Sequence, residues 1–164
     1  MSNHYQGKKT FSENLKQIFW HAIYPIFPYL RDGLVKTGIL HHHGRQPFYL
    51  GHLAPNFTTE KLIEHLHKQG FHRHVVAWHD DGEILSMRKH DSFQYQHHIR
   101  LFDDKEIRGH FELTPESKPF DHFFEKGMVP AKEDFKKYLG DYLVEDASTY
   151  TISHKASDAL ITSP

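Results

Sequence analysis

Two neighbouring segments of the chain alternate strictly between apolar and polar residues, and this alternation is the strongest constraint on the fold. In residues 94–102 and 106–113, apolar side chains recur at odd positions: Tyr95, Ile99 and Leu101 in the first segment, Ile107, Phe111 and Leu113 in the second. A period of two is typical of a β-strand with one buried face. A one-residue slip would turn one apolar set toward water, so the turn between the strands must contain an odd number of residues. We therefore predict an antiparallel hairpin closed by the three residues 103–105.

This register brings polar side chains together on the other face of the hairpin. It places His98 opposite His110 and Arg100 opposite Arg108, with the Cβ atoms of each pair about 4.5–5.5 Å apart. Glu112 has the same parity and shares this face. The sequence thus predicts a cluster of two imidazoles, two guanidinium groups and a carboxylate.

A second hairpin of the same kind is predicted just before the first, with strands at residues 72–79 and 83–90. The last residue of a three-residue hairpin loop usually adopts a left-handed conformation, which suits Gly82 and makes Lys105 a mildly strained substitute. The same parity predicts that Leu85 and Met87 are buried. It adds Arg88 and Trp78 to the face that carries the histidines.

The remaining elements follow from helical periodicity and from the helix-breaking residues. We expect a helix with an apolar stripe over residues 11–23, capped by Ser12, that packs this stripe on the core and stops at Pro25. An irregular stretch through Gly33, Gly38 and Gly44 is expected to follow. A strand at residues 47–53 is expected next, followed by helices opening at residues 56–59, around 121–124 and from 130. The predicted fold is a single α+β domain over residues 1–144, an antiparallel β-meander of four to five strands with helices packed on one face. The polar residues 145–164 are expected to form a loosely ordered C-terminal tail.

The composition excludes several classes of function. The chain has 164 residues and no cysteine, which excludes a disulfide framework, a thiolate zinc site and a cysteine nucleophile. Lys and Arg number 20 against 21 Asp and Glu, so no strong net charge indicates a partner. Without a stretch of about 18 apolar residues or an apolar leader, we expect no membrane association and a cytoplasmic location. The 17 histidines predict charge-dependent behaviour that changes sharply with pH.

The predicted cluster favours acid/base chemistry without a metal or other cofactor. We expect His98 and His110 to act as the proton-transfer pair and Glu112 to orient one imidazole. Arg100 and Arg108 would clamp an anion between them. Arg88 and Trp78 would add contacts to the substrate, which would be a phosphorylated or nucleotide-like molecule.

Four alternatives remain open from the sequence. The same face would serve a non-catalytic module that binds nucleic acid or another polyanion, with strong salt dependence. It would equally serve as an interface in a small scaffold or homo-oligomer subunit. Its arginines would also be balanced within the chain if Glu106 and Glu112 formed salt bridges with them. Finally, His98, His110 and Glu112, with His122, have the donors that suit zinc, iron or nickel, although two nearby arginines would raise the cost of binding a dication. No motif in the sequence assigns the chain to a known family.

Overall fold

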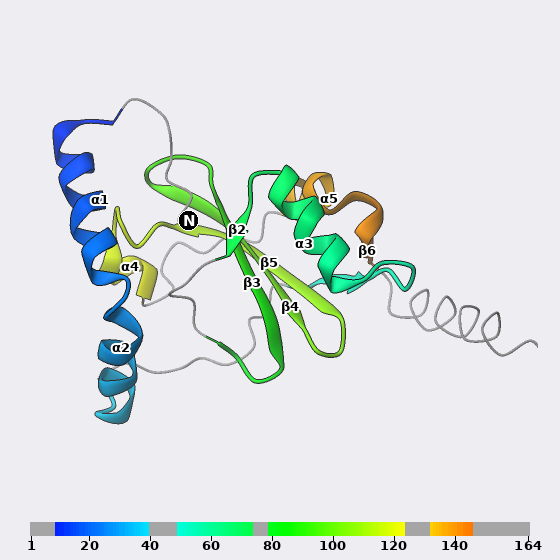
Figure 1. Ribbon diagram of the computed structural model, residues 1–164, viewed down its shortest axis with the longest axis horizontal. Coiled ribbons are helices and arrows are strands. Elements are labelled where there is room, and N and C mark those ends of the chain that lie inside the picture. Colours follow the sequence, from blue (N-terminus) through cyan, green and yellow to red (C-terminus); the bar gives the residue numbers. More distant parts are fainter. Residues whose placement is uncertain (1–8, 40–48, 74–78, 124–131, 146–164) are drawn as a thin grey trace, which may run out of the picture.

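The protein is built around one six-stranded antiparallel sheet with strand order β2–β3–β4–β5–β1–β6. Figure 1 shows this sheet in the middle of the molecule, with helices on either side. The computed structural model describes residues 9–39, 49–73, 79–123 and 132–145. The strands are β1 (Tyr49–Leu53), β2 (His72–Arg73), β3 (Glu83–His90), β4 (Tyr95–Phe102), β5 (Glu106–Leu113) and β6 (Leu143–Val144). The helices are α1 (Phe11–Ile23), α2 (Phe27–Lys36), α3 (Thr59–Lys68), α4 (Pro119–Phe123) and α5 (Lys132–Leu139), followed by the 3-10 turn η1 (Gly140–Tyr142).

The α+β class with an antiparallel sheet is confirmed, with one difference in the number of strands. The meander β2–β3–β4–β5 has the order expected from sequential hairpins. Two further strands extend it, because β1 pairs with β5 and the short β6 pairs with β1. The expected sheet of four to five strands is therefore one of six.

The register of the β4–β5 hairpin is the one that the alternation predicts. His98 pairs with His110 and Arg100 pairs with Arg108 across the two strands. Lys105 closes the turn with a φ of 68°, the left-handed conformation expected of the third loop residue. In the neighbouring hairpin Gly82 has a φ of 78°, and Leu85 and Met87 are buried as predicted.

The main hydrophobic core lies between the odd-numbered face of the sheet and helices α3 and α5. Leu62 and Leu66 of α3 and Phe135 and Leu139 of α5 pack there against apolar side chains of β3, β4 and β5. Gly109 makes the close approach of α5 possible. A Cβ at this position would lie 3.0 Å from Cε1 of Phe135 and 2.8 Å from Cδ1 of Leu50.

The apolar stripe predicted to bury α1 is exposed, and that prediction is wrong. Its members Phe11, Leu15, Ile18 and Phe19 are all exposed, and α1 instead turns Trp20 inward, where it packs with Tyr24 and Phe27. Periodicity identifies an apolar face of a helix but not the element against which that face packs. In α1 a second, narrower set of aromatic residues packs against the rest of the protein.

Two other details of the N-terminal region also differ from expectation. The helix starts at a Thr10 capping box closed by Glu13 rather than at Ser12. Beyond α1, residues Phe27–Lys36 form α2, so the first part of the stretch expected to be irregular, around Gly33, is helical. Pro28 lies in the first turn of α2, where a missing backbone N–H removes no helical hydrogen bond.

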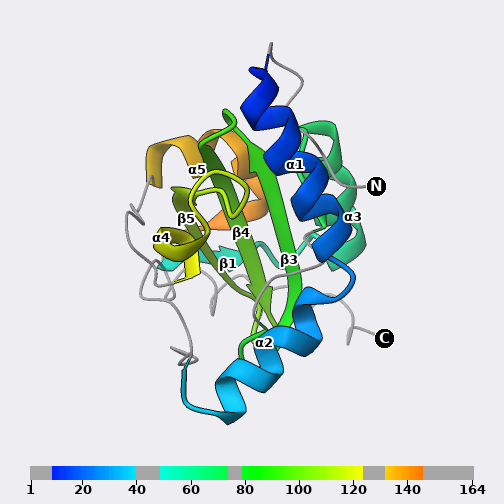
Figure 2. The ribbon, with the colours of Figure 1, turned by 90° about the vertical axis from the view of Figure 1, so that its left-hand side faces the viewer.

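Helices flank the sheet on both sides. The helices α3 and α5 cover one face, as expected, and Figures 1 and 2 show α1 and α4 beside the opposite face. Among the described residues, no helix combines the length and apolar character needed to cross a bilayer.

Candidate functional site

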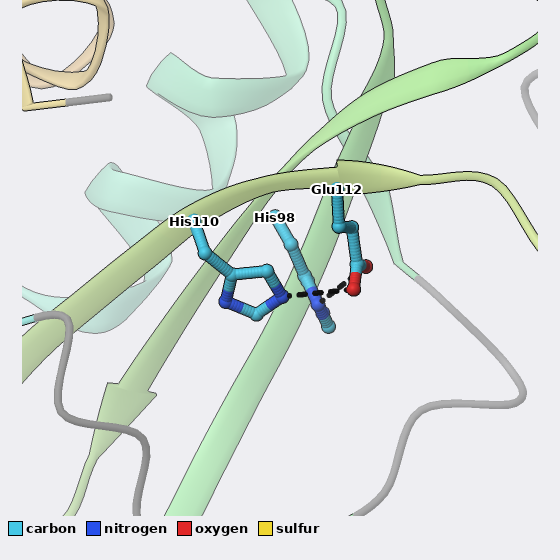
Figure 3. A group of neighbouring side chains, drawn as sticks. All are labelled: His98, His110 and Glu112. Carbon is cyan, nitrogen blue, oxygen red and sulfur yellow. Dashed lines mark ion pairs between the residues drawn. The ribbon is translucent and has the colours of Figure 1, made fainter. Parts of the chain in front are cut away.

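Two histidines and a glutamate meet on the even-numbered face of the β4–β5 hairpin (Figure 3). Nδ1 of His98 lies 3.4 Å from Oε1 of Glu112, and Nε2 of His110 lies 3.1 Å from Oε2 of the same carboxylate. The two imidazole rings have centroids 5.0 Å apart and are nearly perpendicular, at 74°. One nitrogen from each histidine and one oxygen of Glu112 all lie within 4.8 Å of one another. We call these three residues the His–His–Glu cluster.

The His–His–Glu cluster is buried. His98, His110 and Glu112 are only 3%, 2% and 5% exposed. Burial lowers the pKa of His98 to about 3, against the opposing effect of Glu112, so this imidazole is neutral at neutral pH. Burial alone would raise the pKa of Glu112, but His122 and His110 hold it well below its usual range, so the carboxylate is ionised.

Neighbouring polar residues fix the orientation of the cluster. The hydroxyl Oγ of Ser86 lies 2.7 Å from Nε2 of His98, and Nε2 of Gln96 donates a 2.8 Å hydrogen bond to Oε1 of Glu112. His122, which follows in α4, places its Nδ1 2.7 Å from the carbonyl oxygen of Leu113 and 3.5 Å from Oε2 of Glu112. Glu112 therefore meets three histidines, including the His122 that the sequence indicated as an additional candidate.

The two predicted clamp arginines are opposite each other in register, but each one contacts carboxylates of this chain. Nη1 of Arg100 lies 2.8 Å from Oδ2 of Asp80 and 3.6 Å from Oε2 of Glu83. Arg108 pairs with Glu106, the internal carboxylate that the sequence offered as an alternative to a bound anion. Both guanidinium charges next to the His–His–Glu cluster are thus balanced within the protein.

Arg88 is the centre of a second buried polar group on the same face. Its guanidinium lies 3.2 Å from Oε1 of Glu116 and donates to Oε1 of Gln96 at 3.3 Å and to the Tyr24 hydroxyl at 3.5 Å. The Tyr24 hydroxyl also donates to Glu116. Because Gln96 contacts both Arg88 and Glu112, it links this group to the His–His–Glu cluster.

Sequence parity identified some of these residues and missed others. Ser86 and Gln96 share the even parity of the cluster but were not predicted to contact it. Tyr24 and Glu116 carry no local signal, since they reach the face from outside the strands. The predicted substrate contact Trp78 lies outside the described residues.

The burial of this face limits the kinds of binding it offers. Arg88, Arg100 and the His–His–Glu cluster are all at most 5% exposed. An open basic surface, as a nucleic-acid module would use, is not what these five side chains form. A small ligand held among them, above all a metal ion, fits their burial better.

Comparisons with known proteins add no assignment: no protein-family model matches the chain, and neither the curated proteins nor the solved structures contain a significant match.

Proposed function

We propose that the protein binds a divalent transition-metal ion, with zinc the best match, at His98, His110 and Glu112, and that this ion is its functional centre. The observation that carries the proposal is the convergence of two imidazole nitrogens and a carboxylate oxygen within 4.8 Å at a buried position. Two histidines and a glutamate are a donor set found in catalytic zinc sites.

The spacing of the donor atoms supports this proposal. Zinc binds histidine nitrogen at about 2.0–2.1 Å and carboxylate oxygen at about 2.0–2.2 Å, so two donors of one tetrahedral ion lie about 3.3 Å apart. The contacts from Glu112 to His98 and to His110 are 3.4 Å and 3.1 Å long, one through each oxygen of the carboxylate. One donor atom of each residue lies within 4.8 Å of the others, so an ion would bind after side-chain rotations that draw the three donors together.

The surroundings of the cluster also fit an ion. The contacts of Ser86 with His98 and of Gln96 with Glu112 are of the kind that orients metal ligands from outside the coordination sphere. The repulsion expected from nearby arginines is reduced, because Arg100 faces Asp80 and Glu83, and Arg108 faces Glu106. Repulsion by the two arginines, the main objection to a metal site that the sequence raised, is therefore weakened.

Three protein donors leave one position of a tetrahedral ion for water or a substrate atom, as in catalytic rather than structural zinc sites. A metal so placed would act as a Lewis acid and activate a bound water molecule. We accordingly propose a metal-assisted reaction, hydrolysis being the simplest. The metal-independent acid/base reaction on a phosphorylated or nucleotide-like substrate stays a prediction. It has less support, because both imidazoles share one carboxylate and the arginines already have partners.

The test is a binding measurement that separates this site from the many other histidines. His41, His42 and His43 are replaced by Gln in every variant, since a histidine triplet binds metals weakly on its own. The chelator-treated protein is titrated with Zn²⁺ by calorimetry, with metal content measured after dialysis. His110→Gln and Glu112→Gln are compared with His67→Gln, a change at an exposed histidine of α3.

We expect one tight site per chain in the parent and in His67→Gln. The two cluster variants each lose a ligand and are expected to lose at least about tenfold in affinity, since losing only an outer-shell partner of a metal ligand already costs about 10–100-fold. Circular dichroism of each variant confirms that the fold is kept. Equal affinity and stoichiometry in a folded His110→Gln variant would overturn the proposal.

A further inference from the structure

The main apolar face of α1 points away from the rest of the protein. With about 100° of rotation per residue, Trp20 and Tyr24 lie on one side of the helix axis, and Phe11, Leu15 and Ile18 lie on the opposite side. Trp20 and Tyr24 are buried, whereas Phe11 is 85% and Ile18 67% exposed. Figure 2 shows α1 and α2 as the outermost layer on this side of the sheet.

The exposed apolar surface of α1 has the size of an interaction patch. Phe11, Leu15, Ile18 and Phe19 are each more than half exposed. At roughly 100–150 Å² for each side chain, these four offer about 400–600 Å², so an antiparallel pair of α1 helices would bury about 800–1,200 Å² in total. Apolar patches of this size on a monomer are often functional, and interfaces below about 1,200 Å² in total are typical of weak or transient complexes.

The spacing of the stripe is that of a helix pair. Phe11, Leu15, Ile18 and Ala22 follow one another at intervals of four, three and four residues, the pattern of alternating a and d positions in a heptad. When two copies of such a helix run antiparallel, Leu15 of one copy meets Ile18 of the other. Phe11 then meets Ala22, the largest side chain of the stripe against the smallest.

A hollow of about 500 Å³ borders the stripe on one flank of α1. It is lined by Asn14, Gln17, Ile18, His21 and Ala22, of which Ile18 and Ala22 belong to the stripe. Phe11 of an antiparallel second copy would lie beside this hollow. Because the same stripe supplies both the large side chain and the small one that faces it, the contact satisfies the self-complementarity of a two-fold interface.

We propose that the exposed face of α1 binds a second copy of this chain, with the two α1 helices antiparallel and Phe11 of each seated beside Ala22 of the other. A lipid surface fits the same stripe less well. Helices that lie on membranes carry several Lys and Arg around their apolar face, and residues 11–23 contain only Lys16. This interface does not depend on the proposed metal, since none of its residues belongs to the His–His–Glu cluster.

The first test is the oligomeric state of the full chain. Sedimentation velocity over a range of concentrations is expected to show a dimer that Phe11→Ala weakens by about tenfold or more, as for a central interface side chain. Phe120→Ala is the matched control, because Phe120 is 77% exposed on α4 and lies outside the proposed interface. A chain that stays monomeric up to about 100 µM would overturn the proposal.

Cross-linking tests the antiparallel orientation. The chain has no cysteine, so single-cysteine variants Phe11→Cys and Ala22→Cys can be mixed and treated with a short bis-maleimide. The mixed pair is expected to cross-link, whereas Phe11→Cys alone is not, since its two thiols would lie about 16 Å apart along the helices. The reverse result would contradict the antiparallel pairing. Flotation of a monomeric chain with lipid vesicles, lost in Phe11→Ala, would assign the stripe to a membrane instead and overturn the dimer.

Discussion

Neutralising Glu116 should strongly destabilise the protein, because this residue balances a buried arginine. Nη2 of Arg88 lies 3.2 Å from Oε1 of Glu116, and the two residues are 3% and 2% exposed. At this separation and an effective dielectric constant of about 20, the attraction is about 5 kcal/mol. Breaking a buried pair by removing one partner typically costs about 3–5 kcal/mol, because the remaining charge is left without compensation. We expect Glu116→Gln to lower the free energy of unfolding by about 3 kcal/mol.

A double-mutant cycle separates the pair from its neighbours. Arg88→Met combined with Glu116→Gln removes both charges, so its cost should be clearly smaller than the sum of the two single changes. Urea unfolding followed by circular dichroism gives the four free energies. In a Trp78→Phe background, Trp20 is the only tryptophan, and its fluorescence reports whether α1 leaves the sheet when the Tyr24 contacts are lost. Strictly additive single effects, each below about 0.5 kcal/mol, would refute the reasoning.

Three further predictions concern the turn, the core and pH. Lys105→Gly should raise the stability by about 0.5–1 kcal/mol, because it relieves a left-handed conformation at φ 68°; an unchanged or lower urea midpoint would contradict this. Gly109→Ala should cost about 1–3 kcal/mol through its clash with Phe135, whereas Gly33→Ala in α2, where a Cβ meets nothing within 4 Å, should stabilise by up to about 1 kcal/mol; equal midpoints for the two variants would argue against this difference. In metal-free protein, the unfolded chain binds a proton on His98 near pH 6.5 while burial lowers the folded pKa of His98 to about 3, so stability falls with acidification through this window by up to about 1.4 kcal/mol per pH unit. The depressed pKa of Glu116, which Arg88 maintains against the effect of burial, acts in the same direction below its ordinary value of 4.5. An undiminished pH dependence in a folded His98→Gln variant would show that other groups cause it.

The central hairpins were accessible from the sequence because their signal is local and periodic. The parity of residues 94–113 predicted the pairing of His98 with His110, and the structure has that register across β4 and β5. The bounds of β3 and β5 also match the predicted ranges. A register of this kind follows from the need to bury one face, which requires no knowledge of distant elements.

The burial of the polar face could not be predicted from the sequence in the same way. Its burial depends on residues far away in the chain, such as Tyr24, which contacts Arg88 at a sequence separation of 64 residues. The outward orientation of the α1 stripe has the same origin, since only tertiary contacts decide which of two apolar faces meets the protein. The pairing of β1 with β5 likewise joins segments separated by a helix and three strands. Local patterns thus located the cluster, but long-range packing determined that it is buried.

The chemistry inferred for the cluster changed for a related reason. With Arg100 and Arg108 expected side by side on an open face, an anion clamp was the simplest interpretation. The structure gives each arginine an acidic partner from the chain, Asp80 and Glu106 among them. The His–His–Glu cluster keeps two imidazoles and a carboxylate close together, and these donors suit a cation.

Anomalous diffraction from crystals grown with Zn²⁺ would locate the ion without reference to activity. Data collected on both sides of the zinc absorption edge should show a peak about 2.0–2.2 Å from a nitrogen of His98, a nitrogen of His110 and an oxygen of Glu112. If no peak lies at the His–His–Glu cluster while zinc fully occupies another position, for example the His41–His43 triplet, the result would contradict a metal-binding role for this cluster.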